Sequence, residues 1–189
     1  SYEAIQKALS LSKFVSTVEK NLISALSARH PSNKAPQDFN DWTNAYANAM
    51  RAVYKKHPND QDVTALFAEA LISRTPWKLW DLRTGKACAG SSTLEASLVL
   101  EKSIEAINNK LEPLHVGILH YYLHLMEMSP TPEAALITGD KMRTLVPDSG
   151  HLAHMSTHID FQCGHYSNVV SRNSEAIKAD RKFLKCYGA

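Results

Sequence analysis

The stretch LHVGILHYYLHLMEMSPTPE, residues 114–133, contains one complete helix pattern and the start of a second. Its apolar and histidine residues recur at helical spacing, which predicts a helix over about 114–128. The Pro-Thr-Pro run at 130–132 then provides a break, an N-cap and a proline at the first helical position. A second helix is therefore expected over about 132–145.

The same unit, a helix followed by a polar or proline-containing break, recurs along the whole chain. Asp60, for example, is placed to cap a helix whose apolar face includes Val63 and Phe67. No run shows the alternation of a half-buried strand, and one long irregular connection is expected over about 77–91. The sequence thus predicts a single all-α domain over 1–189. Its nine or so helices are expected at about 2–11, 15–28, 42–56, 61–73, 94–111, 114–128, 132–145, 150–162 and 166–185.

Composition excludes several classes of protein. The hydrophobic content of 44% is that of a globular chain, not a disordered one. Lysine and arginine total 21 against 19 acidic residues, with no dense basic run, so nucleic-acid binding has no support. No apolar run approaches the roughly 20 residues that cross a bilayer. The three cysteines are odd in number and far apart, which favours a reducing compartment and a cytoplasmic protein.

The clearest sign of chemistry is the distribution of histidine. Seven of the nine histidines fall between His115 and His165. One trio, His120, His124 and Glu127, follows i, i+4, i+7 spacing; a second, His151, His154 and His158, follows i, i+3, i+7. At about 100° per residue, each trio fits within roughly a 60° sector of its helix. Two one-sided trios are unusual for surface or core histidines.

The helices pair at a period near 34 residues, which is typical of helix–turn–helix repeat arrays. The last pair contains Gly164-His165-Tyr166 followed by Val169 and Ala176-Ile177. It resembles the tetratricopeptide repeat, whose second helix opens with glycine, any residue and an aromatic. Asn173 departs from that pattern, which prefers a large aromatic there. The resemblance implies a right-handed α-solenoid.

The two histidine blocks, residues 115–133 and 150–159, resemble blocks of a family of long tetratricopeptide-like proteins that are widespread in bacteria and also found in fungi. Shorter matches lie at 68–71, 76–77 and 173–180. Members are usually described only as repeat proteins, so the resemblance implies no reaction. Because members are longer at both ends, it implies that these residues are an internal piece of a longer solenoid. Exposed apolar ends would then favour self-association or contact with further repeats.

In such a solenoid, the first helices of successive repeats stand side by side along the concave surface, so the two trios should face one another. Two imidazoles at i, i+4 with a nearby carboxylate can bind a divalent metal. Nitrogen ligands point to a transition metal, Zn or Cu foremost, and tell against Ca or Mg. The candidate ligands are His120, His124, Glu127, His151, His154 and His158, with His115 as a further candidate.

Two functional hypotheses follow. The default role of the fold is to bind a peptide or protein partner in the concave groove, with the histidines as ligands or as a hydrogen-bonded polar network. The alternative is a metal-dependent enzyme, hydrolytic or oxidative, because three protein ligands leave a position for water. The chain has no phosphate-binding glycine loop, G-x-S-x-G or H-E-x-x-H motif.

Three further features have less specific interpretations. The cluster Pro-Trp-Lys-Leu-Trp at 76–80 is expected to be a plug over the repeat ends, with a ligand platform as the alternative. Asp140, Asp148 and Asp160 are expected to be solvated or to cap helices. His165 lies at a turn between helices and is a secondary ligand candidate.

Overall fold

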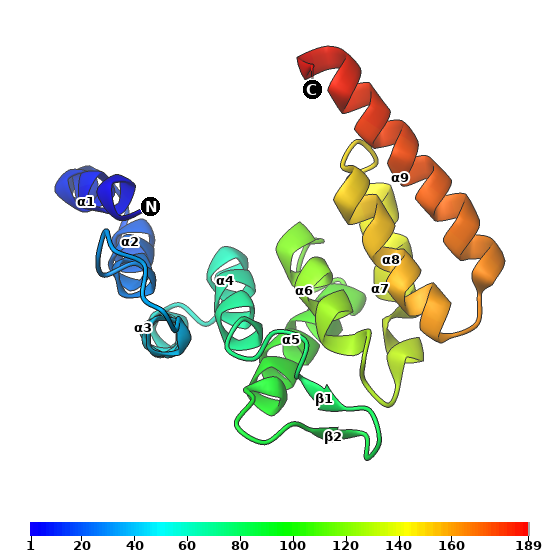
Figure 1. Cartoon of the computed structure of the whole chain (residues 1–189), viewed down its shortest axis with the longest axis horizontal. Helices are drawn as coiled ribbons and strands as arrows, with labels where there is room; N and C mark the ends of the chain where they lie inside the picture. The colour runs from blue at the N-terminus through cyan, green and yellow to red at the C-terminus, as the bar shows by residue number, and fades with distance from the viewer. Residues whose placement is uncertain (189) are drawn as a thin grey trace.

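The computed structural model describes residues 1–188, and within that range nine α-helices account for most of the chain (Figure 1). They are α1 Tyr2–Leu11, α2 Thr17–Arg29, α3 Asn40–Lys56, α4 Gln61–Ile72, α5 Thr93–Asn108, α6 Val116–Met126, α7 Leu136–Leu145, α8 Gly150–Gln162 and α9 Tyr166–Tyr187. Short 3₁₀ turns, η1 Ser12–Phe14 and η2 Pro132–Ala135, precede α2 and α7. Among these residues no helix combines the length and apolarity needed to cross a bilayer. The all-α prediction is confirmed.

Local sequence signals fix where several helices begin. Ser16 and Glu19 form a reciprocal capping box at the start of α2. The Asp60 side chain accepts the backbone N–H of Val63 at 3.0 Å, as predicted for the N-cap of α4. His115 caps α6 in the same way, because its Nδ1 accepts the N–H of Ile118 at 3.3 Å. These caps fix the residues at which α4 and α6 begin.

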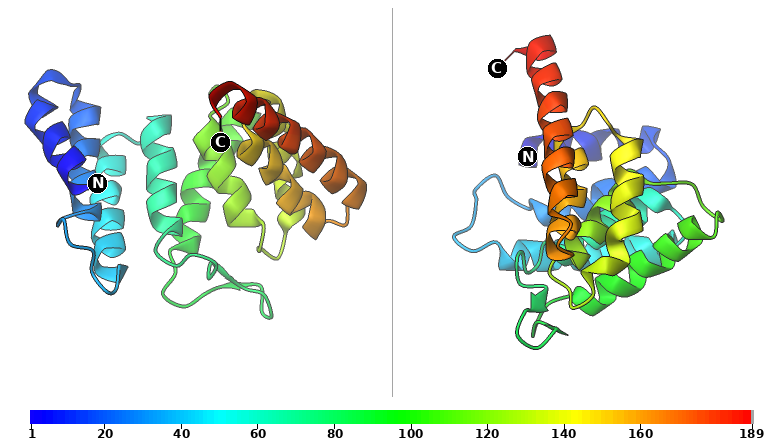
Figure 2. Two further views of the ribbon diagram at one scale, coloured as in Figure 1. Left: turned by 45° about the horizontal axis from the view of Figure 1, so that its top comes forward. Right: turned by 90° about the vertical axis from the view of Figure 1, so that its right-hand side faces the viewer.

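The helices are arranged so that α4, α6 and α8 form a row. Helix α6 contacts both α4 and α8, while α5 packs against α4 and α6, and α7 against α6 and α8. Helix α9 packs along α8 and runs beyond it at its C-terminal end (Figure 2). The two histidine-bearing helices, α6 and α8, are therefore direct neighbours.

The core lies between this row and the helices that pack against it. Fully buried side chains come from α4, α6 and α8 in turn: Phe67, Leu71, Leu119, Leu123, Met155 and Ile159. Burying each one stabilises the fold by about 1.5–3 kcal/mol relative to an exposed position. On α8, the stripe of Met155 and Ile159 lies beside the histidine stripe, so packing of one face fixes the direction of the other.

The connection between α4 and α5 differs from the expected irregular segment. It contains a small antiparallel hairpin, β1 Trp80–Asp81 with β2 Lys86–Ala87, which projects from the helices (Figures 1 and 2). Gly85 provides a left-handed turn position at φ 67°, and a Cβ there would lie 3.1 Å from Pro130. Strands of two residues are too short to produce an alternation in the sequence. A second long connection, residues 30–39, falls in the interval 29–41 that the predicted helix ranges leave unassigned.

Candidate metal centre

Five histidines from α6 and α8 form a continuous row between the two helices. Their ring centroids follow at 5.2 Å from His151 to His120, 4.7 Å to His124, 6.5 Å to His158 and 4.8 Å to His154. The helix faces predicted from the spacing therefore do meet. The 6.5 Å step divides the row into a group of three and a pair.

The group of three lies close enough together to hold a metal ion. One nitrogen each of His120, His124 and His151 lies within 4.8 Å of the others. The Nε2 atoms of His120 and His151 are 3.2 Å apart. Two nitrogens on a tetrahedral Zn²⁺, at 2.0–2.1 Å from the ion, are separated by about 3.3–3.4 Å. This pair already has the spacing of two ligands on one ion.

Glu127, immediately after α6, connects the group of three to the pair. Its Oε1 lies 3.0 Å from Nδ1 of His124, and its Oε2 lies 2.8 Å from Nδ1 of His158. The side chain is only 10% exposed. Burial by itself would raise the pKa of this carboxyl, but the hydrogen bonds from His124 and His158 lower it to about 2. Glu127 is therefore ionised, and each of its oxygens faces one ring nitrogen.

Two imidazoles of the group, those of His120 and His151, have lowered pKa values. Burial, and then the neighbouring His124 and His151, lower the pKa of His120 to about 4. Burial also lowers the pKa of His151, and His124 acts in the same direction. Neutral imidazole is the form that donates a lone pair to a metal, so protons compete little for these two rings near pH 7.

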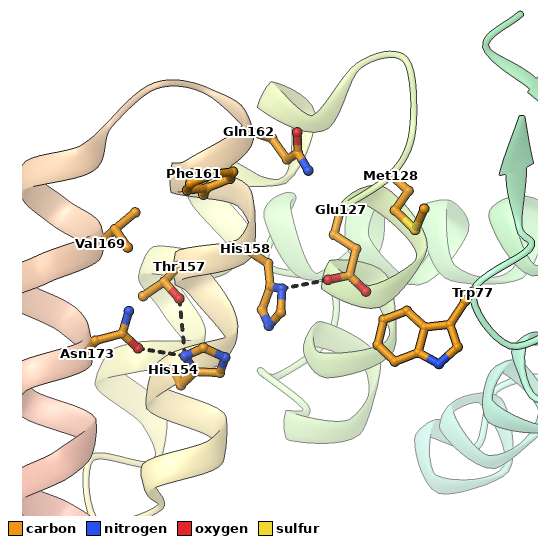
Figure 3. A pocket seen from close by; sticks show the side chains of 10 residues that line it. All are labelled: Trp77, Glu127, Met128, His154, Thr157, His158, Phe161, Gln162, Val169 and Asn173. Atoms are coloured by element: carbon orange, nitrogen blue, oxygen red, sulfur yellow. Dashed lines mark hydrogen bonds and ion pairs between the residues drawn. The ribbon is translucent and has the colours of Figure 1, made fainter. Parts of the chain in front are cut away.

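His154 ends the row and contacts a residue of α9. Its Nδ1 lies 2.6 Å from Oδ1 of Asn173 and 3.3 Å from the hydroxyl of Thr157 (Figure 3). The sequence identified Asn173 only as a departure from an aromatic repeat position. The signal available in the sequence was the polar side chain of Asn173 at a position where the repeat pattern prefers an aromatic.

A groove runs beside the pair and Glu127. One cavity of about 430 Å³ is lined by Trp77, Glu127, Met128, His154, Thr157, His158, Phe161, Gln162, Val169 and Asn173 (Figure 3). A second, of about 270 Å³, shares Trp77, Glu127 and Met128 with the first. Trp77 thus stands between two hollows, on the opposite side of Glu127 from His158.

The aromatic cluster of residues 76–80 divides into two roles. Trp80 donates its Nε1–H to the carbonyl of Leu125 at 2.7 Å, and Leu79 is buried, which fits the predicted plug. Trp77 is 73% exposed and adopts φ 64° within a turn that the bond from Lys78 N–H to Thr75 closes. Left-handed backbone is rare for so large a residue, and such positions are concentrated at functional sites.

Two other candidates lie outside the group. His115 is occupied at the N-terminus of α6, where its Nε2 lies 3.0 Å from Asp62 of α4. His165 lies 3.6 Å from Asp160 at the junction of α8 and α9. Neither belongs to the three-histidine group.

The expectation that Asp160 is solvated or caps a helix is wrong. It is fully buried, and Nη1 of Arg172 lies 2.8 Å from its Oδ2, at an angle that makes the contact an ion pair rather than an aligned hydrogen bond. No pattern in the sequence indicated that α9 would place Arg172 over this face. Asp140 and Asp148 are exposed, as expected.

Three imidazole nitrogens within 4.8 Å of one another can bind a divalent transition metal and leave a coordination position for water. The groove beside them gives a small molecule or a peptide side chain access to that neighbourhood. No protein-family model, no curated protein and no solved structure matches this chain.

Proposed function

We propose that this chain binds a divalent transition metal ion, Zn²⁺ or Cu²⁺, between α6 and α8, within a tetratricopeptide-like repeat module that holds a peptide or protein partner in its concave groove. The observation that carries the metal site is the convergence of His120, His124 and His151, with two Nε2 atoms 3.2 Å apart. Histidines with an isolated structural role do not bring ring nitrogens from two separate helices together in this way.

The arrangement of helices supports the repeat part of the proposal. Helices α6 and α8 begin 34 residues apart and are neighbours in a row with α4, and each is followed by a helix that packs against it. The hairpin connection between α4 and α5 accounts for the longer interval between α4 and α6. We infer a right-handed solenoid whose inner helices are α4, α6 and α8, in keeping with the family resemblance of the histidine blocks.

The choice of metal follows from the ligand atoms. Imidazole nitrogen suits Zn²⁺ and Cu²⁺, whereas Ca²⁺ and Mg²⁺ require oxygen ligands. The lowered pKa values of His120 and His151 favour neutral rings near pH 7, and Glu127, whose pKa is lowered to about 2, adds a negative charge beside them. That charge attracts a cation without occupying a ligand position.

The groove supports the partner-binding role. Trp77 is exposed between two hollows, and aromatic residues of this kind are enriched where proteins bind partners. The competing interpretation of the histidines is a metal-free polar network, in which the contact between His120 and His151 is an N–H···N hydrogen bond. Titration with metal separates these interpretations.

The test is calorimetric titration of Zn²⁺ and Cu²⁺ into protein that was purified without a nickel column and stripped with chelator. We expect one ion per chain for the wild type, and loss of that binding in His120→Ala and His151→Ala. His30→Ala, which removes a histidine on another part of the chain, is the matched control and should bind like the wild type. Absence of binding, or binding that His120→Ala leaves intact, contradicts the proposal.

A further inference from the structure

Helix α5 carries an exposed stripe that is apolar in its first half and acidic in its second. Leu94 and Leu98 are 64% and 73% exposed, and Glu101 and Glu105 are exposed as well. Their spacing, i, i+4, i+7 and i+11, places all four within about a 60° sector of the helix. Lys102 lies on the neighbouring face, where it lines a small cavity. We call the four residues the α5 stripe.

Helix α9 has two exposed rows of side chains that lie next to each other. It packs along α8, and among its described residues only Ala176 and Ala179 are buried. One row is apolar and falls within about a 40° sector of the helix. It consists of Tyr166, Val170, Ile177 and Leu184. The adjoining row is basic and consists of Lys178, Arg181 and Lys185, all exposed.

The charges of the α5 stripe and of the basic row are left over from the ion pairs within the chain. Over residues 1–188, the ion pair of α5 uses Glu95. Those of α9 use Arg172, Glu175 and Lys182. Two glutamates on one helix and three basic side chains on the other therefore remain available to a partner.

The two surfaces are complementary in both apolar surface and charge. If α5 lies along α9, Leu94 and Leu98 cover part of the apolar row, and the glutamates come within reach of the basic row. Burial of the apolar side chains would supply most of the affinity, because exposed ion pairs contribute little. The charges would select the partner and its orientation.

The α5 stripe and the α9 rows cannot meet within one chain. Helix α5 packs against α4 and α6, whereas α9 packs against α8, and Figure 1 shows the two helices in separate parts of the molecule. A second copy of the chain presents both surfaces at once. An anionic membrane would attract the basic row but would leave the α5 stripe uncovered.

We propose that copies of this chain associate, with the apolar and basic rows of α9 in one copy on the α5 stripe of the next. The contact is heterologous, because it joins two different surfaces, so copies can form a ring or a growing chain. The average mass in solution should therefore rise with protein concentration. This association is independent of the proposed metal site.

The test is sedimentation equilibrium of the whole chain over a concentration series, with chelator present so that metal cannot link copies. One variant reverses the acidic charges, Glu101→Lys with Glu105→Lys. A second reverses two basic charges, Lys178→Glu with Arg181→Glu. The control, Glu3→Lys with Glu133→Lys, reverses two exposed glutamates outside α5 and α9.

We expect each reversed variant to associate at least about tenfold more weakly than the wild type, because like charges then face each other. The control should behave like the wild type. Raising the salt concentration from about 0.1 M to about 1 M should also weaken wild-type association, since the Debye length falls from about 10 Å to about 3 Å. An equimolar mixture of the two reversed variants should associate again, because the basic α5 of one fits the acidic α9 of the other.

Three results would overturn the proposal. One is a wild type that stays monomeric at the highest concentration that remains in solution. Another is association that the charge reversals leave unchanged, or that the mixture fails to restore. The third is a monomeric wild type that sediments with phosphatidylserine vesicles, which would show that the basic row binds a membrane surface instead.

Discussion

The Oε2 atom of Glu127, at the end of α6, lies 2.8 Å from Nδ1 of His158 on α8. The other oxygen of the same carboxylate accepts from His124, one turn earlier on its own helix. A single buried charge thus ties two neighbouring helices together through two imidazoles. The orientation of both rings depends on this group.

Replacing Glu127 should weaken the metal site without removing a ligand. In Glu127→Gln an amide N–H can face Nδ1 of His124, which favours the tautomer with its proton on Nε2 and blocks the lone pair. We expect Zn²⁺ affinity to fall by about 10–100-fold in calorimetric titration. Glu133→Gln, which changes an exposed glutamate nearby, is the control. Equal affinity of Glu127→Gln and the wild type would show that the carboxylate does not set the tautomer.

The stability of the metal-free protein should fall as the pH falls from about 6.5 toward 4. Burial and the neighbouring His124 and His151 lower the pKa of His120 to about 4 in the folded state, against 6.5 for an exposed histidine. Between these values the unfolded chain binds a proton that the folded chain does not, so acid favours unfolding. Above pH 6.5 the contribution is fully present.

Urea unfolding at pH 7 and pH 5 measures this effect. His120 is partly exposed, so after an allowance for solvent screening we expect it to account for about 1 kcal/mol of the loss in unfolding free energy. His120→Gln should show a loss smaller by that amount. The prediction does not survive if both proteins lose the same stability between the two pH values. Glu127, with a pKa of about 2, titrates below this range.

Gly117 should resist a substitution that normally stabilises a helix. Alanine in a helix interior is favoured over glycine by about 1 kcal/mol. A Cβ at Gly117 would lie 2.9 Å from Cβ of Ala65, where α6 crosses α4. We therefore expect Gly117→Ala to lower the unfolding free energy by about 1–3 kcal/mol, because the overpacked helices must separate. The double change with Ala65→Gly should recover most of the loss in thermal unfolding; failure to recover would argue against this contact as the cause.

The buried pair of Asp160 and Arg172 should be a large contributor to stability. Asp160→Ala leaves the Arg172 guanidinium buried beside the empty position, with only the exposed Asp140 as a partner. We expect a loss of about 3–5 kcal/mol in chemical unfolding. Asp148→Ala removes one partner of an exposed pair with Lys182 and should change stability by at most about 0.5 kcal/mol. Similar small effects of both substitutions would mean that the buried pair is not structurally important.

Much of the fold could be predicted from periodicity and caps. The bounds of α1 and α8 agree with the predicted ranges, and Gly150 and Gly164 mark the two ends of α8 in the sequence. The same regular spacing predicted that His120 and His151 would face each other once α6 and α8 were neighbours. Helix geometry determines which side chains at a given spacing share one face. The repeat pattern predicts which helices are neighbours.

Other parts of the site could not be predicted, for physical reasons. Spacing placed Glu127 on the histidine face, but it does not reveal which ring nitrogens the carboxylate contacts. The contact of Asn173 with His154 depends on how α9 lies along α8, which a degenerate repeat pattern does not specify. The exposure of Trp77 follows from a left-handed backbone position that no glycine or asparagine marked.

The most direct test of the metal site is diffraction at the Zn absorption edge from crystals of the chain grown with Zn²⁺ near pH 7.5. We predict one anomalous peak between α6 and α8, bonded to one nitrogen each of His120, His124 and His151 at about 2.0–2.1 Å. Glu127 should remain hydrogen bonded to His124, outside the ligand shell. A peak only elsewhere on the chain would contradict the account. The same holds if no peak appears at this position although the ring nitrogens of the three histidines remain about 3–5 Å apart.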